Sequence, residues 1–379
     1  MSISVIPSPA AKASALRYLS CLRLPEILVL QGSPLLGAAF AVGPPAAENL
    51  GALAILLAAN VFLVAHIFML NDWSGLTTDL ADPNKAAGVF TVRGVGRKEI
   101  GGLTAGLLAL SLLLFSRLGP GTLCLALAIA ALSALYSLPR FHWKGRPLLS
   151  SAAHLAGGLL HFLLGYSLGN AIDSRGLALA AFFALTFAAG HLTQEVRDHQ
   201  GDVLNAIRTN AVIFGPRRAF AASLALFTLA YALLFLLALQ GILPRPLAAL
   251  VALYPLHLRW SLKTLAEGLT YASIGRLQAR YRALYAVIGL AMLAALCGGA
   301  PGHPQGARGE NPPAQEREAV ADLWGLVLLS AEDLPCKLEV CRMNEDGGTE
   351  GGRSRVTAGR QECHQTQALF AADRIGNTG

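Results

Sequence analysis

Acidic side chains are scarce along most of this chain but gather in two short stretches, each directly after a long apolar run. Residues 1–299 contain eleven Asp and Glu, and six of these lie in the two stretches. Within each stretch, spacings of three, four or seven residues place the carboxylates on one face of a helix. Two such faces at a membrane edge can hold a divalent metal ion between them. The six residues are Asp72, Asp79 and Asp82 after the run 50–70, and Glu195, Asp198 and Asp202 after the run 177–192.

A metal ion held in this way would in turn bind a diphosphate group. Carboxylates alone repel a diphosphate, whereas Mg²⁺ is a hard cation that takes oxygen ligands from both partners. The metal would also stabilise the charge that develops on departing oxygens. Asn71 directly precedes Asp72 and can supply a carbonyl ligand or orient a carboxylate, and Lys and Arg from nearby loops would complete the anion site. The rest of such a substrate would be an apolar chain, which an intramembrane cavity accepts.

The composition is that of a membrane protein. The chain has 379 residues, of which 54% are hydrophobic and 14% charged, and its mean hydropathy is +0.50. Lys and Arg outnumber Asp and Glu by 22 to 11 in residues 1–299, and no basic run is interleaved with aromatic residues. This pattern favours cytoplasmic loops that face anionic lipid over binding of nucleic acid. The six cysteines show no CxxC spacing and indicate no zinc site, and the first 24 residues lack the apolar core of a signal peptide.

Nine apolar segments predict an all-α, polytopic fold. Helices are expected because every backbone polar group inside a bilayer must be satisfied within its own segment. An apolar segment followed by acidic and then basic residues occurs twice, near 71–98 and near 194–218. This weak repeat suggests two helical halves around a central cavity. The nine segments are residues 27–42, 50–70, 100–115, 122–137, 148–169, 177–192, 219–239, 246–258 and 283–297.

The loop charges predict the orientation of the chain. The N-terminal segment and the loops after the even-numbered segments contain 19 Lys and Arg, whereas the remaining loops contain three. The positive-inside rule therefore places the N-terminus and both acidic stretches in the cytoplasm. We expect an integral protein of a bacterial inner (cell) membrane, with the active-site loops cytoplasmic.

Three regions follow from these patterns. Residues 1–24 form a cytoplasmic N-terminal segment, and residues 25–298 form the transmembrane domain. In residues 299–379 the apolar periodicity disappears, and Gly, Pro, Glu, Arg and Gln dominate. That composition predicts a mostly disordered C-terminal tail.

The residue pattern of the polar stretches resembles that of the UbiA family of intramembrane prenyltransferases. The family has two aspartate-rich motifs, of the forms NDxxDxxxD and DxxxD, each after an even-numbered helix. The resemblance covers residues 15–298 and excludes the tail. The matching stretches are Asn71-Asp72-x-x-Gly75-x-x-x-Asp79, Asp198-x-x-x-Asp202, and Tyr136-Ser137-Leu138-Pro139-Arg140 with Lys144.

The resemblance implies a transferase that moves a prenyl group from a prenyl diphosphate to an aromatic or quinone-precursor acceptor within the bilayer. It implies Mg²⁺ as cofactor and a lipophilic or aromatic acceptor as second substrate, with no nucleic acid and no obligatory protein partner. Tyr136 would stabilise an allylic cation through its ring face. The implied metal ligands are Asp72, Asp79, Asp198 and Asp202, and the implied diphosphate-binding residues are Asn71, Arg140 and Lys144, with Lys85 and Arg93 as further candidates.

One position departs from the family pattern. Gly75 stands where the first motif has its middle aspartate, so one carboxylate is missing from the metal-facing surface. Either Asp82 substitutes for it, or the site holds its metal with fewer protein ligands and more water.

Two other functions compete with prenyl transfer. The first is a terpene cyclase of the same fold, in which a double bond of the substrate's own chain attacks the cation; the altered first motif favours it. The second is a transporter with acidic cation sites. Transporters place such acids at mid-membrane on broken helices, and no Asp or Glu lies in the core of any segment here, which counts against transport.

Several polar residues within the apolar segments receive no catalytic role from the sequence. His154 and His161 lie seven residues apart, on one face of the segment 148–169. We interpret them as packed or hydrogen-bonded side chains. His191 and His199 flank the second motif, and nothing in the pattern assigns them a function. Asn60 is expected to turn towards the interior of the bundle.

Overall fold

The computed structural model describes residues 15–169 and 172–298, and these residues are helical without any strand. The prediction for the tail, residues 299–379, and part of the prediction for residues 1–24 lie outside the described residues. The elements are, in chain order, α1 (Ala15–Cys21), α2 (Leu24–Val29), α3 (Gly32–Val42), α4 (Leu50–Ser74), α5 (Leu76–Ala81), η1 (Ala86–Gly88), α6 (Arg97–Phe115), α7 (Pro120–Ser137), η2 (Trp143–Gly145), α8 (Leu149–Tyr166), α9 (Ser174–Leu204), α10 (Asn210–Phe214), α11 (Pro216–Leu239), η3 (Arg245–Leu253), α12 (Tyr254–Ala266) and α13 (Tyr271–Cys297).

The prediction of an all-α integral membrane protein is confirmed. Seven helical segments in the described part are long and apolar enough to cross a bilayer. The predicted count of nine is approximate, because the fifth and eighth predicted segments correspond to α8 and to η3 with α12. The seven are Leu24–Val42, which contains α2 and α3, together with α4, α6, α7, α9, α11 and α13.

Three helices extend well beyond their apolar cores. The second acidic stretch does not follow its helix as a loop, because α9 runs on to Leu204. The polar segment 259–282 is also helical: α12 continues to Ala266, and α13 begins at Tyr271 after Thr270 caps it by accepting a hydrogen bond from the backbone N–H of Ser273 at 3.1 Å. Hydropathy marks only the part of a helix inside the bilayer, so these polar extensions carry the site residues out of the apolar layer.

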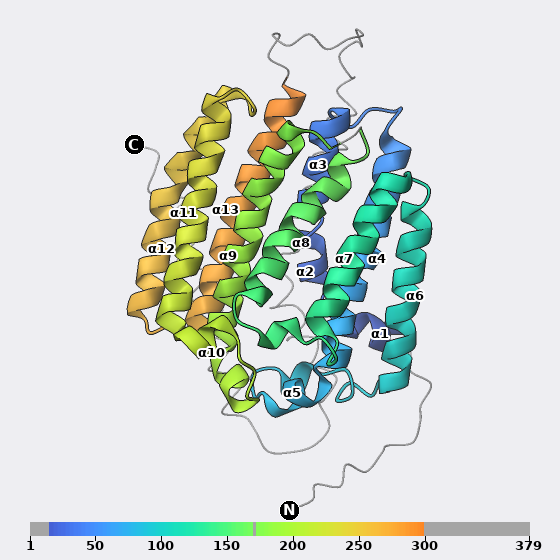
Figure 1. Ribbon diagram of the computed structural model, residues 1–379, viewed down its shortest axis with the longest axis vertical. Coiled ribbons are helices and arrows are strands. Elements are labelled where there is room, and N and C mark those ends of the chain that lie inside the picture. The colour runs from blue at the N-terminus through green and yellow to red at the C-terminus, as the bar shows by residue number, and fades with distance from the viewer. Residues whose placement is uncertain (1–14, 170–171, 299–379) are drawn as a thin grey trace, which may run out of the picture. The chain divides into compact units, whose positions relative to one another are not determined.

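The helices pack as two groups joined through α3 and α8 (Figure 1). One group contains α4, α6 and α7, and the other contains α9, α11, α12 and α13. Between them, α3 and α8 approach closely because Gly165 has no side chain: a Cβ there would lie 1.7 Å from the carbonyl oxygen of Pro34. This arrangement fits the predicted two halves, while the central cavity stays a prediction. It also brings the ends of α4, α7 and α9 and the start of α8 to one end of the bundle, beside α5.

A buried polar chain crosses the joint between the two groups. The Asn60 side-chain amide donates to Gln31 Oε1 at 2.7 Å, and its Oδ1 lies 2.9 Å from Nε2 of His161. The expectation that Asn60 turns inward and that His161 is a hydrogen-bonded core residue is confirmed. This chain ties the junction of α2 and α3 to α4 and α8.

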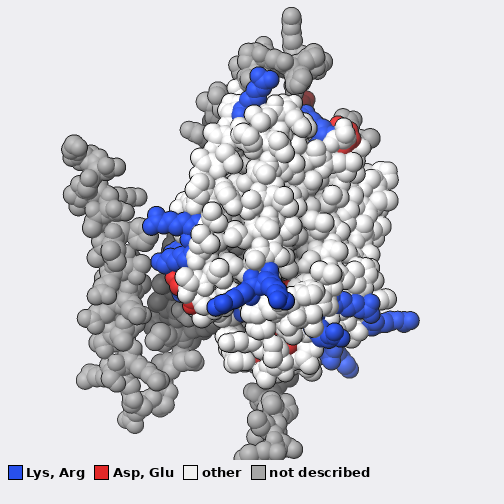
Figure 2. Space-filling model, turned by 60° about the vertical axis from the view of Figure 1, so that its left-hand side comes forward, with Lys and Arg blue, Asp and Glu red and all other residues white. Residues whose placement is uncertain are grey.

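Basic side chains are unevenly spread over the surface. Figure 2 shows most of the Lys and Arg of that face towards the lower end, which is the end that carries α5 in Figure 1, and a broad uncharged surface above them. An uncharged belt of this kind is what a lipid bilayer covers, while the orientation predicted from the loop charges stays a prediction.

The orientation can be tested by cysteine labelling of intact cells. Asn84 lies exposed in the loop between α5 and η1, and Ala47 lies exposed in the loop between α3 and α4. In a cysteine-free background, an impermeant maleimide should label Ala47→Cys from outside, and should label Asn84→Cys only after permeabilisation. Labelling of Asn84→Cys in intact cells would reverse the proposed orientation.

Candidate active site

The first acidic motif spans a break between two helices. The helix α4 carries Asp72 in its last turn, and α5 carries Asp79. The prediction that both lie along one continuous helix is wrong, because Gly75 has non-helical angles of φ −90° and ψ 6°. The backbone N–H of Gly75 still donates to the Asn71 carbonyl at 2.8 Å, and the N–H of Asp79 donates to the Gly75 carbonyl at 2.9 Å. The chain therefore bends at Gly75 without losing its hydrogen bonds.

Asp82 connects the first motif to the second. Its carboxylate is buried, accepts a hydrogen bond from the backbone N–H of Asn84 at 2.9 Å, and lies 3.7 Å from the ammonium of Lys85. It also packs against α9 at Gly201, where an added Cβ would lie 2.2 Å from Asp82 Oδ2. Nearby, the Asn205 side chain donates to the Thr78 carbonyl at 3.0 Å. These contacts hold the loop after α5 against the end of α9.

The second motif lies on α9, where Asp198 and Asp202 are both buried. Two cations flank Asp198: the ammonium of Lys85 lies 2.9 Å from Oδ2, and Arg197 Nε donates to Oδ1 at 2.7 Å. Burial of Lys85 disfavours its charge, but the carboxylates of Asp198, Asp79 and Asp202 outweigh this effect and leave the Lys85 pKa above its usual value. Lys85 therefore stays charged at neutral pH and joins the two motifs electrostatically.

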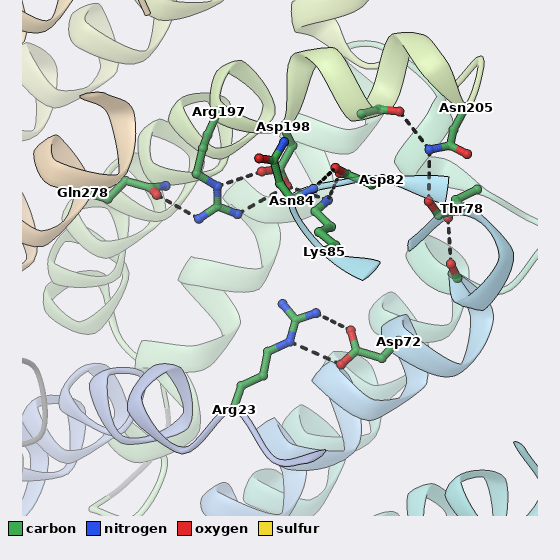
Figure 3. A network of polar contacts seen from close by, with 12 residues as sticks. Arg23, Asp72, Thr78, Asp82, Asn84, Lys85, Arg197, Asp198, Asn205 and Gln278 are labelled. Carbon is green, nitrogen blue, oxygen red and sulfur yellow. Dashed lines mark hydrogen bonds and ion pairs between the residues drawn. The ribbon is translucent and has the colours of Figure 1, made fainter. Parts of the chain in front are cut away.

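Asp72 is paired on the other side of the site. Arg23, just before α2, donates from Nε to Asp72 Oδ2 at 3.3 Å and makes a second contact from its terminal nitrogen to Oδ1. Figure 3 shows this pair facing the cluster of Lys85, Asp198 and Arg197. Arg197 is itself held from α13 by Gln278 Oε1, to which it donates at 2.9 Å. Two arginines, from distant parts of the chain, thus neutralise one carboxylate of each motif.

The site has the donor chemistry of a magnesium site. Among the described residues, no three His, Cys, Asp or Glu side chains converge as a ready-made metal centre. Instead, the paired carboxylates of the two motifs have Lys or Arg beside them, which compensates the cost of burying their charge. Carboxylate oxygens are the ligands that Mg²⁺ prefers, so these residues fit that ion. The flanking cations would then be available to the anionic oxygens of a diphosphate.

The other cations predicted to bind a diphosphate differ in how closely they approach the two acidic motifs. Lys144 lies half-buried in η2, within electrostatic reach of Asp72 and Asp202. Arg140 is exposed and forms no ion pair with the acidic residues that the structure describes. Arg93 is half-buried, with its charge acting on Cys21 of α1. Lys144 is thus the better placed of the three for an anion between the motifs.

Asn71 and Tyr136 both lie at the ends of helices that reach this region. Asn71 is half-buried in the last turn of α4, beside Asp72. Tyr136 is half-buried near the end of α7, and its ring centroid lies 4.9 Å from that of His154. The roles proposed for these two residues stay predictions.

Sequence reasoning missed a polar network centred on Asn210. Its side-chain amide donates to Glu195 Oε2 at 2.9 Å and to Ser150 Oγ at 3.0 Å, and its Oδ1 accepts from the backbone N–H of Leu148 at 2.7 Å. Leu148 has φ +63°, a left-handed angle that a branched residue adopts only when its surroundings enforce it. Asn210 therefore fixes both the start of α8 and the carboxylate of Glu195, and no local pattern in the sequence marks it.

Comparison with known proteins supports the assignment of the fold. A UbiA homolog from Archaeoglobus fulgidus, in structures bound to GPP and Mg²⁺ and to DMAPP and Mg²⁺, superposes with TM-scores of 0.58 and 0.57 at 20% and 19% identity, covering 73% of this chain and 99% of that chain. A UbiA homolog from Aeropyrum pernix K1 gives 0.55 at 19% identity, covering 73% and 97%. A structure of digeranylgeranylglyceryl phosphate synthase gives 0.57 at 16% identity, covering 74% and 98%.

The sequence itself also matches a family. Comparison with curated proteins gives no match. The model of the UbiA prenyltransferase family matches residues 33–273, which include both acidic motifs and the helices that carry them. With more than half of its length matched in this way, the chain belongs to the UbiA prenyltransferase family.

Proposed function

We propose that the protein transfers a prenyl group from a prenyl diphosphate to an aromatic or quinone-precursor acceptor within the membrane, with Mg²⁺ as cofactor. The observation that carries the proposal is the joining of the two acidic motifs at one end of the bundle, through Lys85 and the contact of Asp82 with Gly201. Family membership supports prenyl transfer as the reaction, and the A. fulgidus homolog binds GPP and DMAPP with Mg²⁺.

In this proposal each group of side chains has one task. Asp72, Asp79, Asp198 and Asp202 would hold Mg²⁺, which would supply positive charge for the diphosphate leaving group. The Lys85 ammonium and the Lys144 ammonium bind diphosphate oxygens, with Arg140, Arg93 and the amide of Asn71 as further contacts. Tyr136 presents its ring towards the allylic carbon, because a cation over an aromatic face is stabilised by up to about 2 kcal/mol when desolvated. Asp82 acts through its contacts with Asn84, Lys85 and Gly201, which position the first motif.

The direct test is turnover by the purified full-length protein in lipid nanodiscs. Geranyl diphosphate and MgCl₂ are supplied with a panel of phenols, dihydroxynaphthalenes and prenylated glycerol phosphates, and both diphosphate and prenylated product are measured. We expect Mg²⁺-dependent product with at least one acceptor, and none in EDTA. Diphosphate release that yields only cyclic hydrocarbons or terpene alcohols would identify a terpene cyclase instead. No diphosphate release under any condition would refute both.

The missing carboxylate at Gly75 gives a separate prediction. A Cβ at this position would lie 3.3 Å from Asp79 Oδ2 and 3.1 Å from the Asn71 carbonyl oxygen, which is tight but leaves the side chain next to a motif carboxylate. We expect Gly75→Asp to keep turnover within a few-fold and to lower the Mg²⁺ concentration needed for half-maximal rate. Gly75→Asn, of the same size but without charge, should leave that concentration unchanged. An inactive but well-folded Gly75→Asp would mean that the space at Gly75 is needed by the substrate.

A further inference from the structure

Two stacked histidines lie next to Tyr136, towards the membrane interior from the acidic motifs. The rings of His154 on α8 and His191 on α9 are parallel within 6°, with centroids 3.5 Å apart. Tyr136 meets both edge-on, at 4.9 Å and 6.2 Å between centroids, and the ring centroid of Phe187 lies 5.9 Å from that of His154. His191 precedes Asp198 by two helical turns, so the pair lies about 10 Å along α9 from the second motif.

The hydrogen bonds of His154 determine which ring nitrogen is free to act as a base. Its Nδ1 lies 2.9 Å from the carbonyl oxygen of Ser150. A carbonyl oxygen can only accept, so Nδ1 must carry the proton. In the neutral ring, Nε2 therefore has the lone pair, and no described residue forms a hydrogen bond with Nε2. His154 as a whole is half-buried.

His191 is supported by a carboxylate that is itself fully bonded. Its Nε2 lies 2.9 Å from Glu195 Oε1, one helical turn along α9. Glu195 is buried and accepts hydrogen bonds from Ser150 Oγ at 2.9 Å and from the backbone N–H of Asn210 at 2.9 Å. A proton on His191 would therefore lie next to the negative charge of Glu195.

Together the two rings and Glu195 form a unit that accepts a single proton. Two imidazolium rings stacked at 3.5 Å would repel one another strongly in a poorly solvated site, so both rings cannot be charged together. One positive charge shared by the rings is balanced by the one carboxylate of Glu195.

Resting on the proposed function, we propose that the His154–His191 pair is the general base that removes the proton of the acceptor. As the C–O bond between the prenyl carbon and the diphosphate breaks, its electron pair leaves with the diphosphate. The acceptor forms the new bond to the prenyl carbon and loses the proton of its reacting C–H or O–H group to Nε2 of His154. Glu195 stabilises the charge through His191, and water or buffer finally takes the proton. The base thus lies beside Tyr136, where the cation is expected, and away from the metal.

The titratable groups that face the pair come from three helices. Tyr136 reaches it from α7, His154 contributes from α8, and His191 and Glu195 contribute from α9. Asp198 and Asp202 lie further along α9, where Lys85 and Arg197 neutralise the former. An activity that needs a free base in this group should rise with pH as the pair loses its proton.

The test compares His154→Gln with His161→Gln. His161 lies seven residues further along α8, and its Nε2 lies 2.9 Å from Asn60 Oδ1. Diphosphate release and prenylated product are measured from pH 5.5 to 9 with geranyl diphosphate, MgCl₂ and the acceptor panel. In His154→Gln we expect product formation to fall about 100-fold or more, since general bases contribute 10²–10⁴-fold. The rise of the rate with pH should disappear, while the affinity for geranyl diphosphate stays unchanged. His161→Gln should retain the wild-type pH profile.

A second variant, Glu195→Gln, keeps the proposal testable if His154→Gln fails to fold. Glu195→Gln keeps its hydrogen-bonding shape but removes the charge, and we expect the rise of the rate to move to lower pH, because the proton on the pair loses its partner. If no acceptor of the panel reacts, the geranyl cation either loses a proton to give a diene or captures water to give an alcohol, and His154→Gln should lower the diene fraction. Unchanged rates, product ratios and pH profiles in both variants would overturn the proposal while leaving the proposed function intact. A wild-type protein that releases no diphosphate would overturn both.

Discussion

Replacement of Asp198 by Asn should reduce prenyl-transfer turnover by at least about 100-fold, the range seen when one preorganised charge is removed from a catalytic site. Asp198 is buried and forms two ion pairs: Lys85 Nζ lies 2.9 Å from Oδ2, and Arg197 Nε lies 2.7 Å from Oδ1. Asn keeps the size of the side chain but supplies no anionic oxygen to Mg²⁺, and it leaves both cations unpaired. The loss should appear in the rate at saturating Mg²⁺ and geranyl diphosphate, and not only in their affinities.

The same helix provides a matched control. Asp173 precedes α9 at the opposite end and accepts a hydrogen bond from the backbone N–H of Gly176 at 2.7 Å. Asn caps a helix about as well as Asp, so Asp173→Asn should retain both folding and turnover. Thermal unfolding in detergent shows whether either variant is damaged. Wild-type turnover in a folded Asp198→Asn would remove the second motif from the mechanism.

Replacement of Gly201 by Ala should be nearly as damaging, although no charge is changed. The added Cβ would lie 2.2 Å from Oδ2 and 2.6 Å from Cγ of Asp82. Asp82 has a short, buried side chain held by Asn84, so its whole carboxylate must move, together with the loop that carries Lys85. We expect a 10–100-fold loss of turnover, similar to the loss of a residue that orients metal ligands. The half-saturating Mg²⁺ concentration should rise as well.

Gly190 tests whether the effect is specific to this contact. It lies on the same helix, and a Cβ there would meet Tyr281 Oη at 3.6 Å, an ordinary contact. Both variants lose the same flexible residue from α9, and both should gain a little helix stability, because Ala is favoured over Gly in a helix by about 1 kcal/mol. Gly190→Ala should therefore keep its turnover. Equal activity of the two variants would show that Asp82 tolerates displacement and does not position the site.

The sequence by itself determined the membrane-spanning architecture and the residue types of the site. Apolar runs predict helices in a bilayer because the constraint is local: each segment must satisfy its own backbone. The acids of both motifs could be found for a similar reason. A carboxylate next to an apolar run costs free energy, and the rest of residues 1–299 contains few acids. The polar ends of α9, α12 and α13 were missed because hydropathy does not identify helical residues that lie outside the bilayer.

Tertiary structure alone decided how those residues meet. The pairing of Arg23 with Asp72 and of Lys85 with Asp198 joins residues far apart in the chain, and no spacing rule relates them. The bend at Gly75 depends on angles that a helical wheel assumes to be regular. The sequence predicts a packed residue at His154 and no role for His191, and only the packing of α8 against α9 brings their rings to 3.5 Å. Such contacts depend on the crossing of helices, which is fixed by packing between side chains and not by the pattern of any one segment.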